Sequence, residues 1–467
     1  MGRTKDLIKN ASYFMIGNLG AKVIYFAMLP LYTHWMAPDA FGVVDIINSY
    51  NEILILLIGL GVSDALIVFP IGKKKQEIKL LFTTALWFHI LCCVIFFLLF
   101  YVLSLKKDSL NLGSISNYLW LMFFLLITNS TLRLFQYLCR GIKKMSVFGY
   151  TGIISALCIS LLSFMLIPKW GVKGFLMCGI IANLITTIFV IVYSKSYDYI
   201  CISHFSRNRL KEMLSYSIPL IPNMFMWWFI LSMNRPVIEK YVGIAAVGIF
   251  AVANKIPGIV GMFYNFFHQA WIATAVEEYE SSDFQQYYNN VLKSLTFFQT
   301  IICLGIMSFG NFFIFTFVGY EYHSAIHYLP ILCVSILFSN MATFEGSIFS
   351  ANKQTKYLFY TVIIAAASSL ILNFILIPIW GILGACISVL VAQVISVITR
   401  IFFLKKFLIT ENYVYHIFNI IICIAGTFET LFTHDLYRYV YILFLVLVCF
   451  YFNRHQIKHC LSFIKSK

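Results

Sequence analysis

The segment 166–174, LIPKWGVKG, returns as LIPIWGILG at 376–384, with six of nine residues identical at an offset of 210. Identities between apolar residues are frequent by chance, whereas a shared Pro-x-Trp-Gly-x-x-Gly pattern is not. Upstream of both segments, six further pairs match at the same offset: Lys143, Tyr150, Thr151, Ile153, Ile154 and Ala156 with Lys353, Tyr360, Thr361, Ile363, Ile364 and Ala366. The chain therefore contains an internal duplication.

The composition places the duplicated chain in a membrane. Of 467 residues, 61% are hydrophobic and 11% charged, whereas soluble domains are about 45–50% apolar and about 25% charged. Apolar stretches of roughly 20 residues, enough to cross about 30 Å of hydrocarbon, recur throughout, and they lack the alternation of a β-barrel. We expect about fourteen transmembrane helices, centred near Val23, Leu54, Leu91, Leu125, Ser155, Ile181, Phe225, Ile256, Gln299, Leu332, Ala367, Val389, Ile421 and Leu445.

The basic residues orient these helices. With the N-terminus inside, 24 Lys and Arg residues fall in the inner connections, Arg400, Lys405 and Lys406 among them. The seven outer ones are Lys106, Lys107, Lys169, Lys173, Arg235, Lys240 and Arg438. The positive-inside rule therefore places both termini in the cytoplasm. The formal charge of +15 is mostly a rim that faces anionic headgroups, so it calls for no nucleic-acid partner.

The offset of 210 covers six expected helices. Because six is even, both copies enter the membrane in the same direction, which makes the repeat parallel. We expect an all-α membrane protein with two six-helix bundles, 1–205 and 206–405, around a central cavity. A helix pair and basic tail, 406–467, would follow. In each copy, Pro and Gly should make a tight outer turn with Trp at headgroup depth.

The sequence shows no machinery for soluble-type catalysis. It holds no Gly-rich phosphate loop, HExxH or GxSxG motif, and its twelve cysteines lack the spacing of a zinc site. We therefore expect no catalytic residue, metal or cofactor. Aromatic residues make up 18% of the chain and could stack on sugars, but Trp and Tyr also collect at membrane interfaces, so none is assigned that role.

Four cations are the candidate substrate-binding residues. Lys22, Arg133 and Lys255 fall inside expected helices, and Arg235 lies near the outer end of one. A cation at mid-membrane costs about 2.5–3.5 kcal/mol, so such residues should line a cavity or pair with an acid. Their staggered depths suit an anionic cargo such as a diphosphate. The alternative is a salt bridge to one of the intramembrane acids, Asp45, Glu52, Asp64, Glu345 or Glu429.

Three acids are the candidate ion-coupling residues: Glu52, Asp64 and Glu345. Burial in hydrocarbon favours the neutral form of a carboxyl group, so such a group can exchange a proton or bind sodium during transport. Glu52 is the deepest of the three in its helix. Asp64 and Glu345 lie near expected inner ends, where a side chain can reach water at little cost.

The motifs then suggest a family. The chain resembles the O-antigen and polysaccharide flippases, a branch of the multidrug/oligosaccharidyl-lipid/polysaccharide exporter superfamily, over essentially its whole length. The resemblance rests on residues 60–67 (LGVSDALI), Arg140-Gly141 with Lys143-Lys144, and Asn234-Arg235 followed by 241–243 (YVG), 246–250 (AVGIF) and 254–256 (NKI), with an echo at 41–43 (FGV).

This resemblance implies a multi-pass protein of the bacterial inner (cytoplasmic) membrane. It would carry undecaprenyl-diphosphate-linked oligosaccharide, the repeat unit of O-antigen or a related lipopolysaccharide or surface polysaccharide, from the cytoplasmic to the periplasmic leaflet. Membrane lipid, a coupling ion (proton or sodium) and other polysaccharide-assembly proteins would be its partners. The family often has an acid where Asn234 stands and an Arg where Val68 stands, so an ion pair and a cation of the family are missing here.

Two other functions fit less well. A multidrug/cation antiporter of the same superfamily usually has twelve helices and acidic cavity residues, whereas this chain shows about fourteen expected spans and a set of intramembrane cations. A membrane polysaccharide polymerase generally needs a large extramembrane loop, and the longest connection here is the modest segment 277–290. The sequence therefore favours a transporter over an enzyme.

Overall fold

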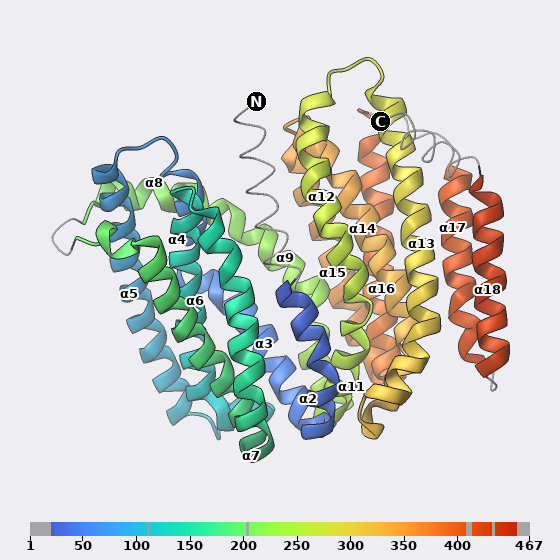
Figure 1. Ribbon diagram of the computed structural model, residues 1–467, viewed down its shortest axis with the longest axis horizontal. Helices are drawn as coiled ribbons and strands as arrows, with labels where there is room; N and C mark the ends of the chain where they lie inside the picture. Colours follow the sequence, from blue (N-terminus) through green and yellow to red (C-terminus); the bar gives the residue numbers. More distant parts are fainter. Residues whose placement is uncertain (1–19, 111, 202–204, 408–412, 432–434, 455–467) are drawn as a thin grey trace. The chain divides into compact units, whose positions relative to one another are not determined.

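The computed structural model describes residues 20–110, 112–201, 205–407, 413–431 and 435–454. Within these ranges the chain is helical and contains no strand, which confirms the expected all-α class. It divides into two compact units, Met1–Trp228 and Phe229–Lys467 (Figure 1). The finer division at 205/206 and 405/406 stays a prediction.

The first unit begins its described part with a helical stretch at 20–27. Seven further helices follow: α2 Leu29–Trp35, α3 Pro38–Ile58, α4 Val62–Val68, α5 Lys75–Leu105, α6 Leu119–Gly141, α7 Met145–Ser194 and α8 Arg207–Ser217, with 3-10 turns at Gly113–Tyr118 and Ser196–Tyr199. Its core joins α4, α5 and α6 through Leu66, Phe82 and Leu138, all fully buried. A 3-10 turn, Ile218–Leu220, then leads into α9 Ile221–Leu231 at the boundary of the two units.

The second unit packs its helices around an aromatic core. In chain order they are α10 Asn234–Tyr241, α11 Ile244–Lys255, α12 Gly258–Glu278, α13 Phe284–Phe317, α14 Leu329–Ala351, α15 Thr355–Trp380, α16 Ile382–Leu404, α17 Tyr413–Gly426 and α18 Asp435–Phe452. At the core, the Phe344 ring stacks on Trp271 and Tyr288 with centroid distances of 4.6 and 5.1 Å. Offset stacking of this kind adds to the stabilisation from apolar burial.

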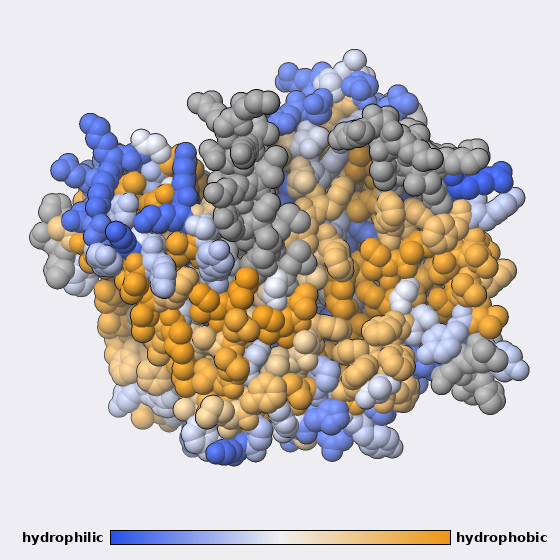
Figure 2. Space-filling model, in the orientation of Figure 1, coloured by the Kyte–Doolittle hydropathy of each residue, from blue (hydrophilic) through white to orange (hydrophobic). Residues whose placement is uncertain are grey.

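Among the described residues, nine helices are long and apolar enough to cross a membrane, or ten if α11 and α12, bent by 46°, form one span. Hydrophobic residues cover the middle of the helices in Figure 2, and hydrophilic residues gather near their ends. The protein is thus a multi-pass membrane protein. The expected count of about fourteen stays a prediction. The structure counts α7 as one helix although it joins two helices across a kink, and α17 and α18 are shorter than the nine spans. The span expected near Val23 lies partly outside the described residues.

The two Pro-x-Trp-Gly copies adopt the same backbone. Gly171 has φ 51° and ψ −123°, and Gly381 has φ 57° and ψ −132°, a combination that is strained for any residue with a Cβ. Three residues later, a Cβ on Gly174 or Gly384 would lie 2.3 Å from the carbonyl oxygen eight residues before it. The chain therefore reverses tightly at both places, as the sequence predicts.

A second feature recurs at the same offset of 210. Lys143 and Lys353 both have positive φ, 62° and 55°. The next amide in each copy, of Lys144 or Gln354, donates to a carbonyl five residues back at 2.8 Å. This left-handed cap ends α6 and α14 in the same way. The duplication seen in the sequence is therefore also a duplication of local structure.

The Gly381 turn gives a testable prediction. Gly381→Ala should lower the free energy of unfolding by about 1–3 kcal/mol, because Ala is strained at this φ and ψ. Thermal unfolding of the purified protein in detergent measures the change. Gly305→Ala, within α13, is the control: no described atom lies within 4 Å of the added Cβ, so stability should stay the same or rise. Equal effects of the two changes would contradict the strained turn.

Candidate functional site

The structure brings two of the predicted site residues together in the first unit. Arg133 on α6 lies with its Nη2 3.3 Å from Oδ1 of Asp64 on α4. Both side chains are largely buried, and the guanidinium also stacks over the Tyr137 ring at 4.9 Å. α4 can present Asp64 here because Gly61, with φ 69°, breaks the chain after α3 and starts a new helix. The salt-bridge alternative for this cation is therefore realised.

Arg235 is the most buried of the four cations. Its side chain, 9% exposed, lies on α10. Nη1 donates to the Leu231 carbonyl oxygen at 2.6 Å and to Asn234 Oδ1 at 3.1 Å, while the guanidinium lies 5.5 Å from the centre of the Phe250 ring. Asn234, which stands where the family often has an acid, thus contacts the Arg through a neutral amide.

The second unit buries an acidic and a basic side chain that interact with each other electrostatically. Glu345 on α14 and Arg400 on α16 are each 2% exposed and interact electrostatically. Arg400 donates from Nε to Thr361 Oγ1 at 3.3 Å and from Nη1 to the Ala342 carbonyl oxygen. Glu345 Oε2 accepts no hydrogen bond from any residue in the described ranges. Glu345 therefore does not reach water, contrary to the cheap snorkelling expected at its helix end.

Sequence reasoning missed Arg400, because it was counted with Lys405 and Lys406 in the cytoplasmic rim. The structure instead buries Arg400 inside α16, which continues to Leu404. The available signal was its position within the largely apolar segment 382–404, where four apolar residues separate it from the Lys pair. Positive-inside counting treats every Lys or Arg near a helix end alike, so it cannot separate a buried Arg from a rim residue.

The remaining predicted residues lie on the surfaces of their units. Lys22, in the helical stretch 20–27, and Glu52 on α3 are exposed in the first unit. Lys255, the last residue of α11, is exposed in the second. Arg133 and Asp64 form a predicted cation–acid pair that the described contacts join. A common cavity for all four cations stays a prediction.

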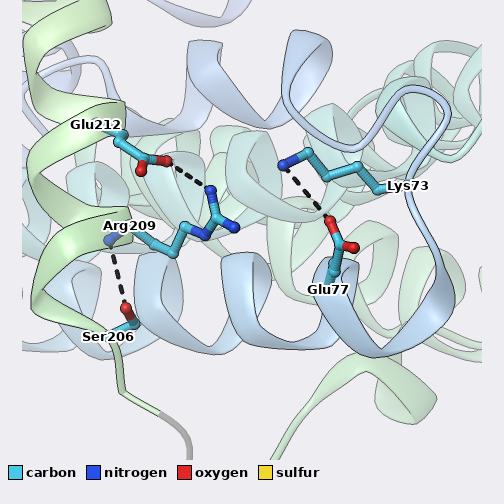
Figure 3. Close-up of polar contacts among 5 residues, drawn as sticks. All are labelled: Lys73, Glu77, Ser206, Arg209 and Glu212. Atoms are coloured by element: carbon cyan, nitrogen blue, oxygen red, sulfur yellow. Dashed lines mark hydrogen bonds and ion pairs between the residues drawn. The ribbon is translucent and has the colours of Figure 1, made fainter.

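The basic rim of the first unit forms local ion pairs. Lys73 Nζ, just before α5, lies 3.6 Å from Oε2 of Glu77 in the first turn of α5. Arg209 Nη1 lies 2.8 Å from Oε2 of Glu212, and both residues are in α8 (Figure 3). Ser206 caps α8 by accepting from the Arg209 amide. The hydrogen bond from Lys75 also lowers the pKa of Asp198, which follows α7. These exposed pairs are rim features rather than a buried site.

Comparisons with known structures identify the fold. A structure of the lipid II flippase MurJ in an inward closed conformation matches 95% of this chain and 99% of that chain, with a TM-score of 0.73 and 16% identity. An inward-facing multidrug resistance MATE family transporter of the MOP superfamily matches 83% of this chain and 95% of that chain, with a TM-score of 0.66 and 16% identity. The chain has the fold of these transporters.

Sequence comparisons identify the family. Residues 7–277 match the family model of polysaccharide biosynthesis proteins. The capsular polysaccharide biosynthesis protein CapF of Staphylococcus aureus is 24% identical over 44% of this chain and 52% of CapF. An uncharacterised membrane protein of Methanocaldococcus jannaschii is 23% identical over 83% of this chain and 95% of that protein. The chain belongs to the polysaccharide biosynthesis protein family.

The Arg133–Asp64 pair predicts a coupling energy. Arg133→Ala or Asp64→Ala alone should destabilise the first unit, because each leaves a largely buried charge unpaired. The double variant should lose less than the sum, with a coupling of about 0.5–3 kcal/mol, measured by thermal unfolding in detergent. The same cycle on Arg209 and Glu212, an exposed pair, should show little coupling. If the losses of unfolding free energy in the two single variants add up to the loss in the double variant, the Arg133–Asp64 contact contributes nothing to stability.

Proposed function

We propose that the protein is a flippase. It moves an undecaprenyl-diphosphate-linked oligosaccharide, the repeat unit of a surface polysaccharide such as O-antigen, from the cytoplasmic to the periplasmic leaflet of the bacterial inner membrane. The observation that carries the proposal is the combination of family and fold: a polysaccharide biosynthesis protein that is built like a transporter. The two duplicated halves, 1–205 and 206–405, would be its moving parts.

The cargo chemistry matches the cations. A diphosphate carries negative charge that is costly to take out of water without compensation. Lys22, Arg133, Arg235 and Lys255 would supply that compensation at successive depths. Arg235 is suited to the role because its guanidinium is buried and oriented by hydrogen bonds to the Leu231 carbonyl oxygen and Asn234 Oδ1. Further donors of a guanidinium can bind phosphate oxygens in the bidentate manner typical of Arg.

Arg133 would reach the cargo by exchanging partners. In the structure it is bound to the Asp64 carboxylate at 3.3 Å. A phosphate offers the same planar pair of acceptor oxygens, so it can replace the carboxylate without leaving Arg133 unpaired. Protonation or sodium binding at Asp64 would favour this exchange by weakening the pair. Asp64 is in this way a candidate for coupling transport to an ion gradient, together with Glu52 and Glu345.

The cation proposal is tested by complementation of a strain that lacks its own flippase. Ala variants of Lys22, Arg133, Arg235 and Lys255 should each lower surface polysaccharide, because a charge-assisted hydrogen bond contributes about 1.5–3 kcal/mol, roughly 10- to 100-fold in binding. Membrane levels of the Lys22, Arg235 and Lys255 variants should not fall, since removing an intramembrane charge eases insertion. Arg133→Ala leaves Asp64 without its partner, so its export is compared at equal protein level in the membrane.

The control for this test is Lys107→Ala, in an exposed outer connection, which should leave export intact. Full activity in all four Ala variants would contradict the proposal that these cations bind the diphosphate. Normal export combined with altered resistance to cationic dyes would favour the multidrug antiporter instead.

The coupling proposal is tested at Glu345. Glu345→Gln removes a carboxyl that must gain and lose a proton, so the pH dependence of transport should flatten while Arg400 stays in place. Transport of the lipid-linked oligosaccharide in proteoliposomes, measured over a range of pH, gives the result. Glu280→Gln, on an exposed loop, should keep the full pH dependence. Parallel pH profiles for the wild type and Glu345→Gln would exclude Glu345 as the coupling group.

A further inference from the structure

A groove between α12 and α13 has a volume of about 770 Å³, within the range of about 300–1,000 Å³ for small-molecule sites. All of its lining belongs to the second unit. The α12 wall consists of Val260, Phe263, Tyr264 and Phe267, and the α13 side of Asp283, Gln286, Tyr287, Asn290, Val291, Ser294, Leu295, Phe298, Gln299 and Ile302.

The two walls differ in chemistry. Phe263 and Phe267 present exposed aromatic rings from α12. On the opposite wall, Gln286, Asn290 and Ser294 carry hydrogen-bonding groups at intervals of four residues, which places them on one face of α13. The groove therefore offers aromatic faces on α12, and on α13 a row of amide and hydroxyl groups that lies beside Tyr287, Phe298 and aliphatic side chains.

Two buried polar side chains in the groove lack hydrogen-bond partners. Gln299 is 3% exposed, and neither its amide nitrogen nor its amide oxygen bonds to any residue in the described part of the chain. The Tyr264 hydroxyl, on a side chain that is 4% exposed, is unsatisfied by the described residues as well. A buried polar group without a hydrogen-bond partner lowers the stability of a protein by about 1–3 kcal/mol. Gln299 and Tyr264 both line the same groove. After a side-chain rotation of Gln299 or Tyr264 toward the groove, a ligand with hydroxyl groups would satisfy them.

We propose that this groove binds the sugar portion of the lipid-linked oligosaccharide, an inference that rests on the proposed flippase function. A sugar ring has an apolar face of C–H groups and a rim of hydroxyls, so it fits between an aromatic wall and a hydrogen-bonding wall. A lipid chain would leave Gln299 and Tyr264 unsatisfied. The described lining holds Asp283 and no Lys or Arg, so the diphosphate itself is not the occupant.

The test uses the full-length protein in nanodiscs. The probe is the oligosaccharide that mild acid releases from the host strain's lipid-linked pool, free of lipid and diphosphate, and binding is measured by saturation-transfer NMR. The wild type should bind it. Gln299→Leu should bind about tenfold more weakly, because one amide provides one or two hydrogen bonds to the sugar. The unfolding temperature of this variant should hold or rise, since a buried amide without a partner is replaced by an apolar side chain.

Matched controls separate binding from folding. Gln393→Leu, on α16, also removes a 1%-exposed amide that no described residue satisfies. It lies outside the groove lining and should leave sugar binding unchanged. Phe298→Ala, in the groove, should weaken binding, whereas Phe309→Ala, on the same helix and equally exposed at 54% against 52%, should not.

The outcomes also separate this inference from the flippase proposal. If the wild type complements a flippase-deficient strain but does not bind the released sugar, or if Gln299→Leu and Phe298→Ala bind it as well as their controls, the groove is not the sugar site. The same holds if the isoprenoid alcohol geranylgeraniol binds the groove in place of the sugar. If the wild type binds the sugar but the strain is not complemented, the groove assignment stands and the flippase proposal fails.

Discussion

A charge inside an apolar helical bundle has no water to solvate it, so the protein must provide a partner. The two units meet this constraint in different ways. In the first, Arg133 and Asp64 bond directly at 3.3 Å. In the second, Arg400 is held by the Thr361 hydroxyl and a backbone carbonyl beside Glu345. The positions of α4, α6, α14 and α16 are restricted by these contacts as well as by packing.

The duplication supplies the scaffold but not the charges. The turn at Gly171 and the left-handed cap at Lys143 recur 210 residues later with nearly the same dihedral angles. The buried Arg residues do not recur: Arg133 corresponds to Thr343 and Arg400 to Val190. Backbone geometry is therefore common to both halves, while each half carries its own electrostatics. The proposed cargo, with a charged diphosphate at one place and sugars at another, would suit two halves that differ in charge.

Tyr264 links the groove of the second unit with its buried charges. Tyr264 lines the groove, its hydroxyl interacts electrostatically with Arg400 and Glu345, and its ring stacks on His268 at 5.4 Å. A ligand that hydrogen-bonds to this hydroxyl would change the local field at the Glu345 carboxylate. In the proposed mechanism, occupation of the groove and protonation of Glu345 would influence each other through this one residue.

The sequence by itself determined the all-helical membrane class, the duplication and the two strained turns, because apolar run length and a Pro-x-Trp-Gly repeat are local properties of the chain. It also placed Arg133 and Asp64 among the candidate pairs. Only the tertiary structure decided that these two meet, that Arg400 is buried beside Glu345, and that α12 and α13 enclose a groove with unsatisfied polar groups. Helix periodicity fixes which residues share a face, but the partner of that face depends on packing between helices far apart in sequence.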